Sequence, residues 1–408
     1  MMASSDPAAA LGASPRAAGS APLADVIVLD LSLLFPGPFA TQMLGDLGAD
    51  VISVEPPDGD FTRRLPNGSF AVTNRNKRSV VLDLKTDSGL RACHQLAAKA
   101  DVFVEGFRPG VVDRLGVGYD AIAEHNPAII YCSISGYGQT GPRRSAPGHD
   151  LTYLATSGAL SFPGHWSEPP RRQGLPVADA AASSFAAIAI LAALHQRERT
   201  GLGTHIDVGI ADAAMALAAL RGGPRLDPPP GDRSHLFPQS DLFTTADGKM
   251  LAISPVEEHF WQRLRRCLAP YDARLLDERF DDDAVRRANG DELSARLTAI
   301  IALEPAAHWE RVFADADVPV DRVLPLGEAV ATAQASARGL LTDIDGERHM
   351  QFPALCNGRP MGISRRVAAP LGADTVEVLR EFGVGEGDIA AVTSPRIDAG
   401  LPTTKERG

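Results

Sequence analysis

The chain has 408 residues, a formal net charge of −11, and 44% hydrophobic and 22% charged residues. This is an ordinary globular composition with room for two domains, and the acidic balance argues against a general nucleic-acid partner. Four scattered cysteines form no CxxC pair and no metal-ligand spacing, which indicates a reducing compartment without a disulfide framework or zinc site. The longest strongly apolar stretch, residues 185–194, is about half as long as a membrane-spanning helix. We therefore expect a buried helix there, no membrane partner and a cytoplasmic location.

The first part of the chain alternates strands and helices. Residues 26–31 form an apolar run of strand type, 33–38 read as a loop, 39–47 have helical spacing, and 50–55 form a second strand. A strand, a helix and a strand within about 30 residues predict a βαβ unit and hence a parallel sheet. Further strands are expected at 80–84, 102–105, 129–134 and 205–208, and further helices at 87–98, at 151–157, after Asp179 to about 199, and from about 211. The pattern indicates an open α/β domain of Rossmann type.

The first turn between strand and helix argues against a dinucleotide cofactor. Glu55 closes the second strand, where an acid that binds a ribose often lies. The turn itself, however, reads Pro36-Gly37-Pro38 instead of G-x-G-x-x-G, and without those glycines the backbone cannot approach a pyrophosphate in the usual way. No redox cofactor is therefore expected.

Two groups of basic residues lie near predicted strand ends. The first (NRNKR) precedes the third strand and contains Arg75, Lys77 and Arg78, and the second (EGFRPG) follows the fourth strand and contains Arg108. Open α/β sheets bind ligands at the carboxyl ends of their strands, and Arg and Lys suit phosphate groups. The alternative for each of these residues is a solvated loop.

A long loop rich in Gly and Pro ends at His149. Such loops often carry function, and imidazole is the side chain whose pKa lies nearest neutrality, so His149 is a candidate general base. The alternative is structural, with Asp150 as the N-cap of the following helix and His149 as its surface neighbour.

Two acidic residues lie at predicted helix starts. Asp179 precedes the Ala-rich helix, where an N-cap is its natural structural role. A carboxylate at this place is held rigidly and its charge is stabilised, so Asp179 is also a candidate acid–base group or nucleophile. Glu257 lies in the first turn of a helix after Ser254-Pro255, where the helix dipole favours acids.

Seven fragments, in this order, resemble the family III CoA-transferase superfamily (CaiB/BaiF type), which includes the α-methylacyl-CoA racemases. They are GDLGADVISVE (45–55), NKRSVVLDLK (76–85), ADVFVEGFRPGVVDRLG (100–116), GYGQTGP (136–142), GHDLTYLATSGALS (148–161), LAALHQRERTGLGTHIDV (191–208) and ADGKMLA (246–252). The similarity runs from about residue 23 to 392. Each fragment alone is weak, but the combination is specific.

The resemblance leaves two chemistries open. Transferases such as formyl-CoA transferase use an Asp at the position of Asp179 as a nucleophile that forms a mixed anhydride with the acyl group. Racemases use this Asp and a His at the position of His149 as an acid–base pair. A Glu that supports the histidine lines up with Glu257, with Glu258 as the alternative one residue later. Because this sequence has such a His, 30 positions before Asp179 as in the racemases, we expect an α-methylacyl-CoA racemase-like isomerase and keep CoA transfer as the alternative.

The expected racemisation interconverts 2-methylacyl-CoA stereoisomers. The thioester acidifies the α-hydrogen, so His149 would remove a proton from one face while Asp179 delivers one to the other face of the enolate. Coenzyme A enters as part of the substrate, and no metal or other cofactor is expected. The residues expected to bind it are Arg75, Lys77, Arg78, Arg108 and Tyr153.

One departure from the racemase pattern bears on the reaction. Racemases typically have glycines after the Asp, whereas residues 180–184 read AAASS here, which affects acyl-group preference or even reaction type. A non-catalytic protein that binds CoA is a third hypothesis.

The resemblance also implies a domain plan and a homodimer. We expect a disordered extension at 1–22, the first part of a large α/β CoA-binding domain at 23–221, a Pro/Gly-rich linker at 222–240, a small α+β domain at 241–323, a return linker with the C-terminal part of the large domain at 324–395, and a tail at 396–408. Two such chains would interlock, with the active site between the large domain of one subunit and the small domain of the other.

Overall fold

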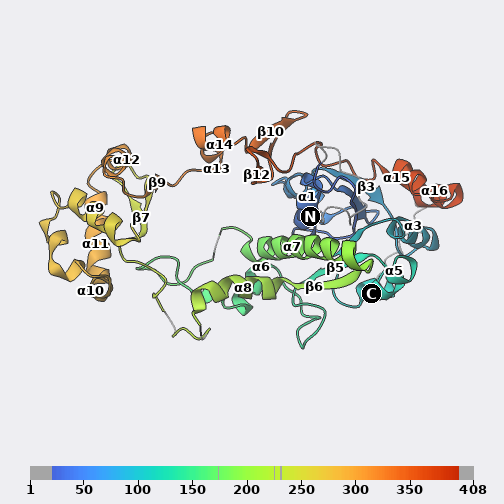
Figure 1. Cartoon of the computed structure of the whole chain (residues 1–408), viewed down its shortest axis with the longest axis horizontal. Helices are drawn as coiled ribbons and strands as arrows, with labels where there is room; N and C mark the ends of the chain where they lie inside the picture. Colours follow the sequence, from blue (N-terminus) through green and yellow to red (C-terminus); the bar gives the residue numbers. More distant parts are fainter. Residues whose placement is uncertain (1–20, 173, 225, 230–231, 395–408) are drawn as a thin grey trace, which may run out of the picture.

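A computed structural model describes residues 21–172, 174–224, 226–229 and 232–394. The tail expected at 396–408, and the extension expected at 1–22 except for its last two residues, lie outside the described residues. Figure 1 shows a larger body built around a sheet and a smaller body set apart from it, with chain segments running between them.

A six-stranded parallel sheet forms the centre of the larger body. Its strands are β1 (Ile27–Asp30), β2 (Asp50–Glu55), β3 (Lys77–Val81), β4 (Val102–Glu105), β5 (Ile130–Ser135) and β6 (Thr204–Gly209). The spatial order is β3-β2-β1-β4-β5-β6, so the direction of winding reverses between β1 and β4. The predicted α/β fold class with an open parallel sheet is confirmed. Such a reversal leaves a crevice at the carboxyl ends of the strands, where open sheets bind ligands.

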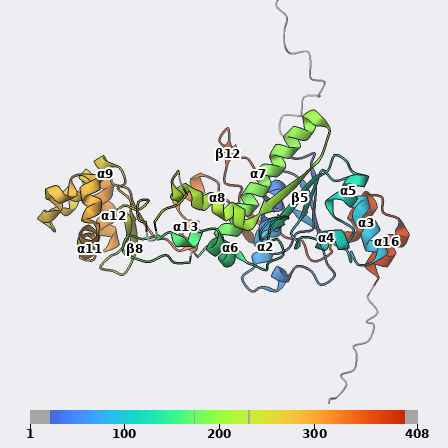
Figure 2. The ribbon, with the colours of Figure 1, turned by 90° about the horizontal axis from the view of Figure 1, so that it is seen from below.

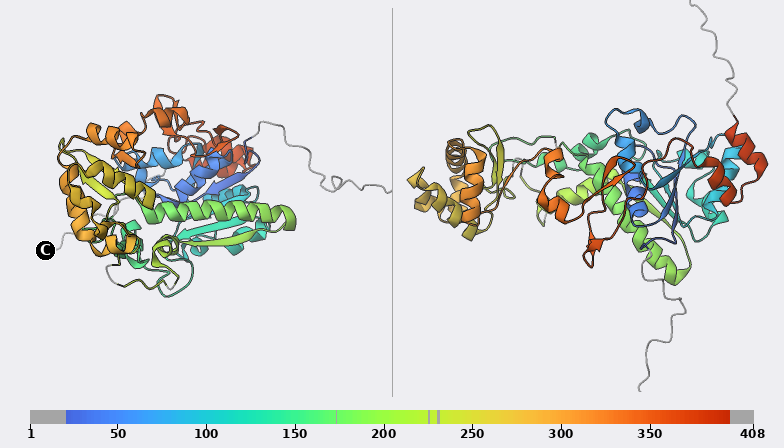
Figure 3. Two further views of the ribbon diagram at one scale, coloured as in Figure 1. Left: turned by 60° about the vertical axis from the view of Figure 1, so that its left-hand side comes forward. Right: turned by 90° about the horizontal axis from the view of Figure 1, so that it is seen from above.

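Helices cover both faces of this sheet. One face carries α1 (Pro36–Asp46), α6 (Asp150–Thr156), α7 (Val177–Thr200) and α8 (Ile210–Gly222), and the other carries α3 (Asp87–Ala97), α4 (Val111–Arg114), α5 (Tyr119–His125), α15 (Thr375–Glu381) and α16 (Glu386–Thr393). Val28 and Leu29 are neighbours on β1 but pack into opposite cores, because successive strand residues point to opposite faces. Figure 3 shows the long helix α7 running along the sheet.

The smaller body has its own core. It consists of the antiparallel strands β7 (Asp241–Thr244), β8 (Met250–Ile253) and β9 (Val320–Arg322), the helices α9 (Glu258–Leu268), α10 (Asp283–Ala288), α11 (Gly290–Ile301) and α12 (Ala306–Asp315), and the 3-10 turns η3 (Ala273–Leu276) and η4 (Glu278–Phe280). Trp261 and Trp309 are fully buried at its centre. The views from two sides agree that it stands away from the parallel sheet (Figures 1 and 2).

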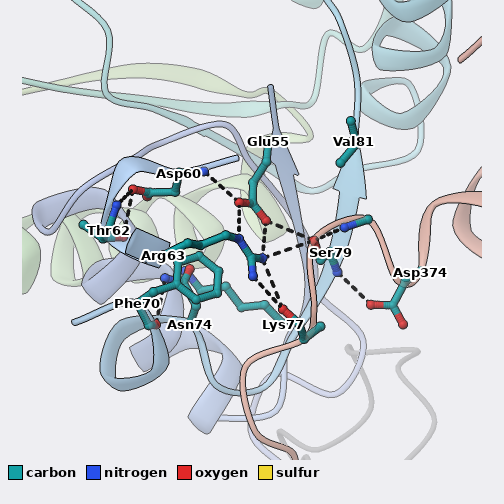
Figure 4. Close-up of polar contacts among 12 residues, drawn as sticks. Glu55, Asp60, Thr62, Arg63, Phe70, Asn74, Lys77, Ser79, Val81 and Asp374 are labelled. Carbon is teal, nitrogen blue, oxygen red and sulfur yellow. Dashed lines mark hydrogen bonds and ion pairs between the residues drawn. The ribbon is translucent and has the colours of Figure 1, made fainter. Parts of the chain in front are cut away.

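The remaining short elements belong to the larger body or to the segment that returns to it from the smaller body. The larger body also contains η1 (Phe61–Arg64), α2 (Ser69–Asn74) and η2 (Ala159–Ser161). The returning segment contains α13 (Leu326–Ala329), α14 (Ala333–Ala337), the hairpin β10 (Leu341–Ile344) with β11 (Glu347–Met350), and the short pair β12 (Leu355–Cys356) with β13 (Arg359–Pro360). The carboxylate of Asp374 accepts a hydrogen bond from the backbone N–H of Ser79 at 2.7 Å, which fastens the returning chain to β3 (Figure 4).

Two sequence expectations about local structure are corrected. The predicted loop at 33–38 is partly helical, because α1 begins at Pro36 and prolines suit the first turn, where their missing N–H costs nothing. Helix α7 is not buried all round: Ala186, Ile190 and Leu194 lie in the core, but Phe185 is 40% and Ile188 61% exposed. By length and composition α7 could also cross a membrane, and half of its apolar window is buried against the protein.

Candidate functional site

A cavity of about 320 Å³ opens at the carboxyl ends of β1, β4 and β5. It lies where the sheet reverses its winding, and we call it the switch-point pocket. Four residues predicted from the sequence line it together: Arg108, His149, Tyr153 and Asp179. Segments far apart in the chain therefore meet at the place where open α/β sheets bind ligands.

Asp179 lies in the first turn of α7. The expectation that it caps this helix is wrong, because Pro176 is the N-cap and α7 begins at Val177. Within the described residues, the Asp179 carboxylate accepts no hydrogen bond and forms no ion pair. Burial, and then the negative charge of Asp150, raise its pKa to about 7, whereas its place at a helix N-terminus favours the charged form. A carboxylate with no protein partner in a cavity is free to react with a bound substrate.

Asp150 joins the two helices that carry the candidate reactive groups. Its Oδ1 accepts hydrogen bonds from the backbone N–H groups of Ala178 at 2.8 Å and Asp179 at 3.3 Å. Asp150 is the first residue of α6, and the N-cap of α6 is His149, so the structural alternative that Asp150 caps α6 is wrong. The first turn of α7 is thus held by a side chain from the start of α6.

His149 supplies an exposed imidazole to the pocket. Its backbone N–H donates to Thr152 Oγ1 at 2.9 Å, which fixes the start of α6. His149 and Thr152 form a capping box at this helix start, and His149 also lines the pocket. Its exposed ring can therefore meet a ligand there.

Tyr153 is wedged between two glycines. A Cβ at Gly136 would lie 2.6 Å from the Tyr153 hydroxyl oxygen, and one at Gly148 would lie 2.4 Å from its Cε1. Only glycine admits the ring at these positions. Burial first, and then the charge of Asp179, raise the pKa of Tyr153 to about 12, whereas Arg108 acts in the opposite direction. The phenol therefore stays neutral and borders the pocket as a hydrogen-bonding group.

Two arginines line the pocket, and one of them, Arg144, was not singled out from the sequence. Arg108 follows β4, and Arg144 lies in the Gly/Pro-rich loop before His149. Both are exposed, and neither side chain has a hydrogen-bond or ion-pair partner in the described parts of the chain. The pair Arg143-Arg144 in a Gly/Pro-rich loop was the available signal, but nothing in the sequence tells which of the two faces the pocket.

The basic cluster before β3 does not line the pocket, contrary to expectation. Lys77 and Arg78 are the first residues of β3 and not part of a preceding loop. Lys77 is 2% exposed, and its Nζ contacts Asp30 Oδ2 at 3.0 Å, the carbonyl of Pro38 at 2.9 Å and Asn74 Oδ1 at 2.9 Å. With three acceptors in place, this ammonium group is not open to a CoA phosphate.

The two arginines of the cluster are also paired internally. Arg75 is buried and forms a forked pair with Asp46, at 3.1 Å from Nε to Oδ1 and 2.5 Å from its second nitrogen to Oδ2. Arg78 pairs with Asp50 and, at 2.5 Å, with Glu381 of α15. These contacts hold β3 to its neighbours, so we no longer expect these side chains to bind CoA phosphates.

Glu55 is likewise engaged inside the larger body. It is 1% exposed and accepts two hydrogen bonds from Arg63, at 2.7 and 2.6 Å, and a third from Ser79 at 3.0 Å (Figure 4). Both oxygens of this carboxylate are thus engaged by protein groups.

Glu257 does not line the pocket of its own chain. It is the N-cap of α9 in the smaller body, one position before the helical turn expected from the sequence, and its side chain makes no capping hydrogen bond. No group of three or more His, Cys, Asp or Glu residues within the described ranges is arranged to hold a metal ion.

A second cavity of about 140 Å³ adjoins the first. It is mostly apolar, lies beyond the ends of β1, β2 and β3, and shares Leu33 and Phe107 with the switch-point pocket. Phe107 is held by a hydrogen bond of 2.7 Å from its backbone N–H to the buried carboxylate of Glu105. A long ligand can therefore extend from Asp179 past Phe107 into an apolar recess.

Comparisons with known proteins place this geometry in a family. The family model described as CoA-transferase family III matches residues 23–375. The acetyl-CoA:oxalate CoA-transferase of Acetobacter aceti is 36% identical over 90% of this chain and 97% of its own. The succinyl-CoA:glutarate CoA-transferase of Mus musculus is 33% identical over 88% of this chain and 86% of its own.

Solved structures agree with the sequence comparisons. A CAIB/BAIF family protein from Brucella suis superposes with a TM-score of 0.79 at 28% identity, over 89% of this chain and 100% of its own. The protein Rv3272 from Mycobacterium tuberculosis gives a TM-score of 0.76 at 31% identity, over 88% of this chain and 99% of its own. The resemblance seen in the sequence is therefore confirmed, and the chain belongs to CoA-transferase family III.

Proposed function

We propose that this protein is a CoA-transferase that moves coenzyme A from an acyl-CoA to a free carboxylic acid. The observation that carries the proposal is the carboxylate of Asp179, which has no partner among the described residues and lines the switch-point pocket. The relatives named above are transferases that act between CoA thioesters and carboxylic acids. Transfer, expected from the sequence only as the alternative, thus has better support than racemisation.

The proposed chemistry uses Asp179 as a covalent carrier. Its ionised carboxylate attacks the thioester carbonyl, the C–S bond breaks, and an acyl–Asp179 anhydride and CoA thiolate result. The thiolate attacks the aspartyl carbonyl, which releases the first acid and leaves an Asp179–CoA thioester. The acceptor carboxylate then displaces the thiolate, which attacks the new acyl group to give the second acyl-CoA and free Asp179. No proton is gained or lost overall.

The adjoining cavities offer a course for the CoA moiety. The thioester would lie at Asp179, and the CoA chain beyond its sulfur would pass Phe107 and Arg108 toward the apolar recess. Arg108 is exposed and has no partner within the described ranges, so its guanidinium can pair with a phosphate at this junction. Coenzyme A takes part as substrate, and we propose that no other cofactor is required.

Racemisation stays the second candidate because His149 lines the same pocket as Asp179. It needs one of these groups charged and the other neutral, and a pKa of about 7 for Asp179 permits either state near neutrality. The placement of Glu257 in the smaller body gives it no contact with His149 in the same chain.

We also propose a homodimer in the cytoplasm. Helices α7 and α8 present exposed apolar side chains, among them Ile188, Met215 and Leu220, which are 61%, 51% and 80% exposed. Exposed apolar residues gathered on neighbouring helices favour association. A partner's smaller body lying over the pocket would bring its α9 and Glu257 to the site.

Trapping of the covalent carrier tests the function. During turnover with acetyl-CoA and an acceptor acid, hydroxylamine should inactivate the enzyme, and mass spectrometry should find a hydroxamate on the peptide with Asp179. Asp179→Asn should give no adduct and lower kcat by at least about 10³-fold. An unmodified Asp179 together with α-proton exchange from D₂O into a 2-methylacyl-CoA would instead establish the racemase.

A further inference from the structure

Arg144 brings a positive charge to the switch-point pocket that nothing described in the structure neutralises. It lines the pocket with Asp179, and its side chain forms no ion pair or hydrogen bond within the described residues. The adjacent Arg143 is engaged: it donates to the Tyr137 hydroxyl at 2.8 Å, and its guanidinium carbon lies 4.2 Å from the centre of that ring. Of the two neighbouring arginines, only Arg144 lines the cavity.

The two arginines of the pocket come from different loops. Arg108 follows Phe107, which lines both cavities, and the proposed course of CoA runs past it. Arg144 belongs to the loop that ends at His149, and neither arginine lines the second cavity. Because the proposed course assigns Arg108 to a phosphate, Arg144 is the pocket cation that is left for the acyl group near Asp179.

We propose that Arg144 is a specificity-determining residue that binds the second carboxylate of a dicarboxylic acyl group. This inference rests on the proposed CoA transfer. An acceptor with two carboxylates uses one in the reaction, and the other is repelled by the charge of Asp150 unless a cation pairs with it. A guanidinium group binds a carboxylate through two parallel hydrogen bonds, which fixes orientation as well as charge.

Discrimination follows from the same pairing. A dicarboxylate gains a charge-assisted pair at Arg144, whereas a monocarboxylate of equal length leaves the guanidinium in water and gains nothing. The relatives named for oxalate and glutarate transfer act on acids with two carboxylates, which agrees with this choice of substrate class.

The experiment compares matched acids and matched arginines. With acetyl-CoA as donor, which has no second carboxylate, kcat/KM is measured for succinate and glutarate and for butyrate and valerate. Arg144→Gln should lower kcat/KM for the dicarboxylates by about 10- to 100-fold, leave it unchanged within about twofold for the monocarboxylates, and leave KM for acetyl-CoA unchanged. Arg144→Lys should restore part of the lost kcat/KM for the dicarboxylates. The control Arg143→Gln should leave kcat/KM unchanged for both classes of acid.

Each other outcome has a definite meaning. An equal loss for both acid types, no loss at all, or a selective rise in KM for acetyl-CoA would overturn the assignment, and the last would make Arg144 a phosphate contact. If the wild-type protein transfers CoA to no acid while α-proton exchange proceeds, the proposed function itself fails, and the role of Arg144 fails with it. Transfer by the wild-type protein with a uniform effect of Arg144→Gln leaves the function standing and rejects only this inference.

Discussion

The larger body contains two groups of charged residues that behave in opposite ways. Around β2 and β3, Glu55 and Lys77 are buried and Arg63 is partly buried. Glu55 pairs with Arg63, and Lys77 pairs with Asp30 (Figure 4). In the switch-point pocket, Asp179 and Arg144 have no partner within the described residues. A paired group of buried charges holds strands and loops in register, whereas charges left without protein partners are available to a substrate. The candidate site therefore differs from the rest of the larger body in that its charged groups lack ion-pair partners among the described residues, and not in the number of its charges.

The largest expected effect on stability comes from breaking the paired group. Lys77→Met removes the only cation bonded to Asp30 within the described residues and leaves a fully buried carboxylate without this ion pair. We therefore expect a loss of about 3 to 5 kcal/mol in the free energy of unfolding. Urea unfolding followed by circular dichroism measures it. Arg78→Met, one residue along β3, is the matched control and should cost about 1 kcal/mol or less, because its partners Asp50 and Glu381 are partly exposed. Equal losses for both variants would contradict the comparison.

A smaller effect of opposite sign is expected from the unpaired carboxylate. The pKa of Asp179 is about 7 in the folded chain, whereas an aspartate in the unfolded chain has its ordinary pKa of 3.8. Between these two pH values the folded state keeps a proton that the unfolded state has lost. Stability is therefore lost as pH rises from about 4 to 7, by at most about 4 kcal/mol for this group. Asp179→Asn removes the free-energy cost of ionising a buried carboxylate, so this variant should be more stable than wild type at about pH 8 but not at about pH 4. Stability that is lower than wild type at both values would show that the carboxylate is paired after all.

The smallest predicted effect is a shift in the pH profile. If ionised Asp179 attacks the thioester, kcat/KM should rise with a midpoint near the pKa of about 7. Asp150→Asn keeps the Oδ1 acceptor for Ala178 but removes the nearby negative charge, so the midpoint should move to lower pH by less than about one unit. Asp120→Asn on α5, at the other face of the sheet, is the control and should leave the profile unchanged. A midpoint that stays in place would remove Asp150 as a determinant of the Asp179 pKa.

The sequence was sufficient to predict the fold class, and four of the eight site residues that it predicted line the candidate site. Strand and helix alternation predicted the parallel sheet because hydrophobic runs and helical periods are local properties. Arg108, His149 and Asp179 were candidates because they lie near predicted strand and helix ends, which the topology brings to one edge of the sheet. The family resemblance favoured a catalytic role for His149 and Asp179, and Tyr153 came from that resemblance alone.

The basic cluster and Arg144 show what the sequence could not provide. Lys77 and Arg144 are equally basic in a sequence, and only long-range contacts decide which one is neutralised. Asp30 lies 47 residues before Lys77, and no local sequence pattern predicts that these two residues pair. Nor does the sequence say which of two adjacent arginines turns toward a ring and which toward a cavity, since side-chain direction in a loop depends on its tertiary neighbours.

Trp166 connects the two bodies of the molecule. Its indole N–H donates to Asp291 at 2.9 Å, its backbone N–H donates to Asp241 at 2.9 Å, and its ring fills the space that a side chain at Gly290 would need. The chain has three tryptophans, and the other two are sealed inside the smaller body. Trp166 is thus an intrinsic fluorophore at the joint, and an emission change on substrate addition would register movement of the smaller body without any added label.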